Sequence, residues 1–124
     1  MKTGTLLRLS AVLEAATGVA LIAIPEVAAR VLLGTTLSPS GIAVARVGGF
    51  ALLSLGLSCL PGGEEVTPQA VRALFIYNLL AGVYLGYLRF GGGFDGFLLL
   101  PASILHALIT LLMVRPAYKA IRRD

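Results

Sequence analysis

Four polar side chains of this sequence lie inside long apolar segments, and they are the residues that could do chemistry. They are Glu14, Arg46, Asn78 and His106, one in each segment. An ionisable side chain within a membrane-spanning helix is costly, and it marks a functional site by default, with a partner that compensates its charge. Because Glu14 is the acid of this set and Arg46 carries a permanent positive charge, we expect them to form an ion pair. Asn78 and His106 would complete a hydrogen-bonded core around the pair.

The segments that hold these residues are long enough to cross a bilayer. They cover residues 5–24, 40–60, 69–90 and 97–114, and about 20 residues of helix span the roughly 30 Å of a hydrocarbon core. Segment 25–34 is amphipathic and too short to span, so we expect an interfacial helix there. The predicted fold class is an all-α integral membrane protein. Four transmembrane helices form an up-down bundle, with a short interfacial helix after the first, in a single domain of residues 1–124.

Capping and turn residues set the expected ends of these helices. Ser38 and Thr67 each precede a proline, an arrangement that caps a first turn and tolerates the missing N–H of the proline. Asp95 follows three glycines and is a candidate cap for the last helix. Pro116 cannot donate a helical hydrogen bond, so it is predicted to bend or end that helix.

Small residues recur at every fourth position in two of the spanning segments. The second segment carries Gly41, Ala45 and Gly49, and the third carries Gly82 and Gly86 on one stripe with Asn78. Positions four apart share a helix face, and small residues there let helices approach closely within a membrane. We expect both faces to be helix contacts. The stripe of the third segment could pack within the chain or between two copies.

The composition is typical of a membrane protein. Of the 124 residues, 57% are hydrophobic and 13% are charged, whereas soluble domains average about 25% charged residues. The net charge of +4 does not indicate a nucleic-acid partner, because the basic residues stand at helix ends and form no continuous patch. The single cysteine, Cys59, excludes an intrachain disulfide and a cysteine metal cluster.

Basic residues are divided unevenly between the two expected membrane faces. Seven lie on the side of the termini: Lys2, Arg8, Arg72, Arg115, Lys119, Arg122 and Arg123. Arg30 and Arg89 lie on the other side. Since cytoplasmic loops carry the excess of Lys and Arg, we expect a multi-pass protein of the prokaryotic plasma (inner) membrane with cytoplasmic N- and C-termini.

The four polar residues are expected at similar depths in the membrane. Counting 1.5 Å of helix rise per residue places Glu14 and Asn78 about 13 Å from the cytoplasmic face and Arg46 about 20 Å from it. His106 comes out near mid-membrane. Long side chains can bridge this slab of roughly 8 Å. Two interpretations stay open: the cluster binds or moves a ligand, or it only fixes how the helices pack.

Three further residues are candidates for lining a pocket at this cluster. Ser103 and Thr110 share a helix face with His106, at spacings of three and four residues, and Tyr77 adjoins Asn78. We expect no metal site, because there is no second histidine and no HxxH, CxxC or HExxH spacing. We find no nucleophile–base pair and assign no catalytic residue.

This pattern resembles the DoxX-like group of small four-helix bacterial membrane proteins. The resemblance is carried by Glu14 in the first helix, residues 45–49 (Ala-Arg-Val-Gly-Gly) in the second, Asn78 in the third and His106 in the fourth. It covers most of the chain. It implies a four-helix fold and either a link to quinone-dependent redox systems or an accessory role beside other membrane proteins.

The first helix is also similar to that of the small multidrug resistance transporters. These are four-helix chains of this size with an essential glutamate in the first helix, and residues 11–14 here read Ala-Val-Leu-Glu. The similarity implies a proton-coupled transporter that uses Glu14. An arginine in the second helix and the lack of any tryptophan distinguish this chain from that family.

The sequence therefore predicts a protein whose buried polar cluster binds a lipophilic ligand, such as a quinone or a lipid, or which serves as an accessory subunit of a membrane complex. The alternative is the proton-coupled transporter. No cofactor motif is evident, and a quinone is the one candidate. The expected partners are membrane lipids and either another membrane protein or a second copy of the chain.

Overall fold

The computed structural model describes residues 1–63 and 65–122, which form five α-helices. These are α1 (Thr3–Ala23), α2 (Pro25–Leu33), α3 (Pro39–Cys59), α4 (Pro68–Phe90) and α5 (Leu99–Ile121), and no strand occurs in the described ranges. All of them except α2 are long and apolar enough to cross a membrane. The predicted fold class is confirmed: the chain is an all-α membrane bundle with a short helix after the first span.

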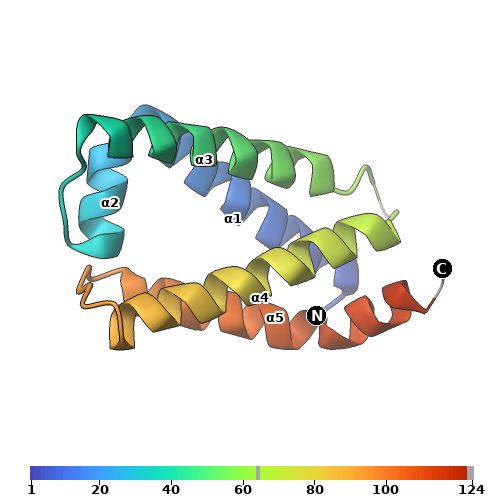
Figure 1. Ribbon diagram of the computed structural model, residues 1–124. Helices are drawn as coiled ribbons and strands as arrows, with labels where there is room; N and C mark the ends of the chain where they lie inside the picture. The colour runs from blue at the N-terminus through green and yellow to red at the C-terminus, as the bar shows by residue number, and fades with distance from the viewer. Residues whose placement is uncertain (64, 123–124) are drawn as a thin grey trace.

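The long helices run alternately up and down, so the N-terminus and the end of α5 lie at the same end of the bundle (Figure 1). α1 packs along α3, and α4 packs along α5, whereas the two pairs meet each other less extensively. α2 lies across the opposite end, where it contacts α1, α3 and α5. Arg123, which the sequence analysis assigns to the side of the termini, lies outside the described residues.

Helices α1 and α3 approach closely because glycines face each other along their contact. A Cβ atom at Gly18 would lie 2.6 Å from the carbonyl oxygen of Gly49, and one at Gly49 would lie 2.7 Å from that of Gly18. Two turns further on, a Cβ atom at Gly56 would lie 2.5 Å from the carbonyl oxygen of Ala11. These positions admit no larger side chain, which lets the two backbones pack against each other. The predicted contact face is thus confirmed at Gly49, whereas Gly41 faces the residues that precede α3.

The small-residue stripe of α4 is a contact with α5. A Cβ atom at Gly82 would lie 3.2 Å from the backbone nitrogen of Ala107. Gly86 faces the Ser103 hydroxyl, which donates a hydrogen bond to the carbonyl oxygen of Gly82 over 3.1 Å. The stripe therefore packs within the chain.

Two predicted helix caps are present. Ser38 Oγ accepts a hydrogen bond from the backbone N–H of Gly41 at 3.1 Å, and Thr67 Oγ1 accepts one from that of Ala70 at 3.3 Å. In both helices a proline follows the cap, where its missing N–H leaves no helical bond unmade. These short signals fix where α3 and α4 begin.

The expectation for Asp95 is wrong, because α5 begins at Leu99 without a side-chain cap. The backbone N–H of Leu98 donates instead to the carbonyl oxygen of Val31 in α2 at 2.9 Å. This bond ties the loop before α5 to α2. Pro101 then falls in the first turn of α5, where a proline is tolerated.

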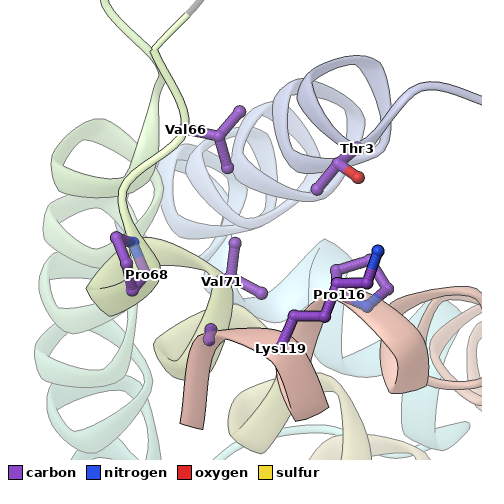
Figure 2. A pocket seen from close by; sticks show the side chains of 7 residues that line it. Thr3, Val66, Pro68, Val71, Pro116 and Lys119 are labelled. Atoms are coloured by element: carbon purple, nitrogen blue, oxygen red, sulfur yellow. The ribbon is translucent and has the colours of Figure 1, made fainter. Parts of the chain in front are cut away.

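The last helix continues past Pro116, so the predicted end at residue 114 is also wrong. Ala117 and Ala120 belong to the same buried cluster as Val71 of α4, and this packing holds the final turns although the proline removes one backbone hydrogen bond. Figure 2 shows Pro116 and Lys119 near Val71 around a cavity of about 210 Å³. This cavity lies at the end of the bundle that carries the termini.

The glycine contact between α1 and α3 predicts different effects for two neighbouring substitutions. Gly49→Ala places a methyl group against the backbone of α1, and overpacking of this kind costs about 1–3 kcal/mol. Gly48→Ala is the matched control, because a Cβ atom there meets nothing within 4 Å. We expect the thermal unfolding midpoint in detergent, followed by circular dichroism, to fall for Gly49→Ala and to stay or rise for Gly48→Ala. Equal losses would contradict the packing described here.

Candidate functional site

Asn78 is the centre of a buried hydrogen-bond network that joins α1, α4 and α5. Its side chain is fully buried. Nδ2 donates to the carbonyl oxygen of Leu74 and to Ser10 Oγ of α1, both at 2.8 Å. Oδ1 lies 2.8 Å from Nδ1 of His106 in α5. Each polar atom of the amide therefore has a partner, and one side chain links three helices.

Glu14 lies beside this network with 1% of its surface exposed. Its Oε1 accepts no hydrogen bond from any residue in the described ranges, and His106 Nδ1 is 3.9 Å away, too far for a hydrogen bond. The Tyr77 hydroxyl lies close to the carboxyl group and interacts with it. The Tyr77 ring meets the His106 ring edge-on, with centroids 5.9 Å apart. A buried polar atom without a partner costs free energy, so Glu14 is the member of the cluster that packing alone does not explain.

Arg46 is not part of the cluster, so the predicted ion pair with Glu14 is wrong. The Arg46 side chain is exposed, and its Nε donates to the carbonyl oxygen of Ile22 at 3.3 Å. Ile22 lies eight residues after Glu14 in α1, about 12 Å along the helix axis. The guanidinium group is therefore near the end of α1 that adjoins α2.

The axial offset between α1 and α3 explains this difference. Counting from the segment ends assumed that the two helices start and stop at the same depth. Because Gly49 lies opposite Gly18, α3 begins beyond the last turn of α1, and Arg46 comes level with Ile22. An arginine at this depth can extend toward the membrane interface, which lowers its cost.

Some of the other predicted site residues belong to the cluster in the structure, and two of them do not. Glu14, Asn78, His106 and Tyr77 come together as described. The Ser103 hydroxyl donates to a backbone carbonyl of α4, and the Thr110 hydroxyl donates to that of His106 at 2.8 Å. Neither of these two lines the cavity beside the cluster. Ser103 joins α5 to α4, and Thr110 bonds within α5.

A cavity of about 460 Å³ lies between the two helical pairs, next to the polar cluster. Every helix contributes to its lining, and Tyr77 and His106 form its polar end. Its walls are mainly apolar and include Leu21, Leu52, Leu80, Ala81 and Leu85. Along α4 the lining extends from Tyr77 to Leu85, about 12 Å toward α2.

Sequence reasoning missed several of these residues. Ser10 lies four positions before Glu14 and hence on the same helix face, so this spacing could have identified it. Tyr84 lies seven positions after Tyr77, two turns further along α4. Leu52, by contrast, is one of many apolar residues in α3, and nothing in the sequence marks it as part of a cavity.

The fold and the site define a class of protein: a multi-pass α-helical membrane protein with a buried Glu–Tyr–His–Asn cluster beside an apolar cavity. No family model matches the sequence, and no curated protein or solved structure matches it. The resemblances to the DoxX-like group and to the small multidrug resistance transporters therefore stay predictions. Within the described ranges, no three His, Cys, Asp or Glu side chains gather as a metal site would require.

The geometry predicts that Asn78 stabilises the bundle and Arg46 does not. Asn78→Leu leaves the Nδ1 atom of His106 without its partner, and an unsatisfied buried group of this kind costs about 1–3 kcal/mol. Arg46→Ala removes one exposed hydrogen bond, so little change is expected. The measurement is the thermal unfolding midpoint of both variants in the same detergent. If Arg46→Ala were the more destabilising of the two, the ion pair with Glu14 would have to be reconsidered.

Proposed function

We propose that the protein binds a lipophilic molecule with a polar head group inside the membrane. The observation that carries the proposal is the cavity of about 460 Å³ with Tyr77 and His106 at one end. Ligand pockets typically measure about 300–1,000 Å³ and are mostly apolar, with a few oriented polar groups that fix the ligand. The cavity agrees with this description in both its volume and its lining.

The polar end of the cavity supports binding over a purely structural role. A cluster that only fixes helix packing is expected to satisfy all its buried polar atoms. The amide of Asn78 meets this expectation, but Oε1 of Glu14 does not. Glu14 is next to the polar end of the cavity, because its carboxyl group lies close to the Tyr77 hydroxyl and 3.9 Å from His106 Nδ1. A polar head group at this end would lie next to Glu14 Oε1, the buried oxygen that has no hydrogen-bond partner in the described ranges.

The cavity faces the surface that lipid would cover. Leu80 and Tyr84 line it, yet they are 63% and 60% exposed, and both lie in a helix able to span the membrane. α3 and α4 are close near the loop that joins them and separate toward α2 (Figure 1). A lipid-soluble molecule would therefore enter sideways from the bilayer, between α3 and α4.

We further propose the prokaryotic plasma membrane as the location, with both termini in the cytoplasm. Arg46 belongs to the α2 end of the bundle, where it joins Arg30 and Arg89. The balance of basic residues is then seven at the termini against three at the α2 end, which accounts for all ten. An excess of this size favours a cytoplasmic location for the termini.

Native mass spectrometry of the gently solubilised protein tests the binding function. We expect a discrete small-molecule adduct on the wild type and its loss in Leu52→Trp, because the indole would fill the cavity from α3. Leu57→Trp is the matched control, since Leu57 lies on the same helix, is 58% exposed and does not line the cavity. Circular dichroism would establish that both variants are folded.

Two outcomes of this experiment would contradict the proposal. One is a wild-type protein that carries no small molecule. The other is an adduct that persists equally in Leu52→Trp. If a second polypeptide is found instead, the protein is better described as an accessory subunit.

The proposed orientation predicts the behaviour of reporter fusions. Green fluorescent protein fused after the C-terminus should fluoresce, and alkaline phosphatase at the same position should be inactive, because both report a cytoplasmic location. Truncated fusions after residue 92, in the loop between α4 and α5, should show the reverse. The same pattern at both positions would exclude this topology.

A further inference from the structure

The orientation of the Asn78 amide is fixed by its neighbours. The carbonyl oxygen of Leu74 can only accept a hydrogen bond, so the amide atom 2.8 Å from it must be the donor Nδ2. The same nitrogen bonds Ser10 Oγ on α1. Oδ1 is therefore the atom that faces His106.

This orientation determines which ring nitrogen of His106 carries the proton. Oδ1 is an acceptor, so Nδ1 at 2.8 Å must donate to it. In a neutral imidazole one nitrogen donates and the other accepts, which leaves Nε2 as the acceptor. Nε2 makes no hydrogen bond to any residue of the described ranges. His106 is 8% exposed and lines the cavity.

Two hydroxyl donors beside the polar end of the cavity face partners within the protein. The Tyr77 hydroxyl lies close to the Glu14 carboxyl group and interacts with it. The Thr17 hydroxyl, on the cavity wall, donates to the carbonyl oxygen of Leu13 within its own helix at 2.9 Å. Tyr84, the other hydroxyl-bearing residue on the wall, lies two turns further along α4. The polar end of the cavity thus presents an acceptor, the lone pair of His106 Nε2, beside the Tyr77 and Thr17 hydroxyls, which face Glu14 and Leu13.

We propose that the ligand is a hydroxyl-bearing lipophile whose O–H donates to Nε2 of His106. This inference rests on the proposed function and specifies its ligand. Phenols, hydroquinones and long-chain alcohols have the required proton. A quinone has only acceptor oxygens, so it would leave Nε2 unpaired in an apolar cavity, and a site built around a hydrogen bond discriminates strongly against a molecule that lacks the matching group.

The test uses two probes that differ by one hydroxyl proton. The full-length protein in lipid nanodiscs is titrated with 4-hexylphenol and with its methyl ether, 4-hexylanisole, by isothermal titration calorimetry. Empty nanodiscs give the contribution of partitioning into lipid. We expect the phenol to bind about ten-fold more tightly than the ether, the factor that corresponds to one buried hydrogen bond. His106→Phe keeps a ring at this position but lacks Nε2, so it should bind the two probes with similar affinity.

Each other outcome overturns a distinct statement. If the wild type binds both probes equally, or prefers the ether, His106 Nε2 is not the acceptor that selects the ligand, while the binding function stands. If His106→Phe keeps the full preference for the phenol, another group recognises the hydroxyl. If neither probe binds the wild type above the level of empty nanodiscs, the proposed function fails together with this inference.

Discussion

The hydrogen bond between Asn78 and Ser10 is the interaction on which the arrangement of this bundle depends. The chain folds as two close helical pairs, α1 with α3 and α4 with α5, and the pairs meet each other less extensively. Asn78 donates across this boundary to Ser10 and also holds His106 on its own side. Hydrocarbon offers no alternative partner to these polar groups, so their bonds favour one relative position of the two pairs. The cavity exists because the pairs are joined at this level and separate beyond it.

The sequence predicted the spans, the short helix and the starts of α3 and α4, because these depend on local signals. The length of each apolar segment determines where the spans lie. Ser38 and Thr67 cap their helices through hydrogen bonds to residues only three positions further along the chain. The continuation of α5 could not be predicted in this way. Pro116 weakens the helix locally, and only the burial of Ala117 and Ala120 against other helices outweighs that effect.

The candidate site shows the same division between local and tertiary information. Glu14, Asn78 and His106 were grouped correctly by depth, since each lies near the middle of its own helix. Arg46 was misplaced because its depth depends on how far α3 is shifted along α1, and the contact of Gly18 with Gly49 sets that shift. The polar end of the cavity was predicted from the sequence, but its apolar walls were not. They are ordinary apolar residues, and they line one cavity only because the two helical pairs diverge toward α2.

The loop before α5 closes the α2 end of the bundle with backbone contacts. Leu98 donates to Val31, and Gly96 packs so tightly on the carbonyl oxygen of Leu32 that no Cβ atom would fit there. Leu32 itself lines the cavity, so these contacts lie at the α2 end of the cavity. With the entry between α3 and α4 proposed above, a ligand exchanges within the plane of the bilayer. The occupancy of the cavity is consequently governed by the mole fraction of a compound among the lipids, and two compounds of equal intrinsic affinity differ in occupancy according to how strongly each partitions into the membrane.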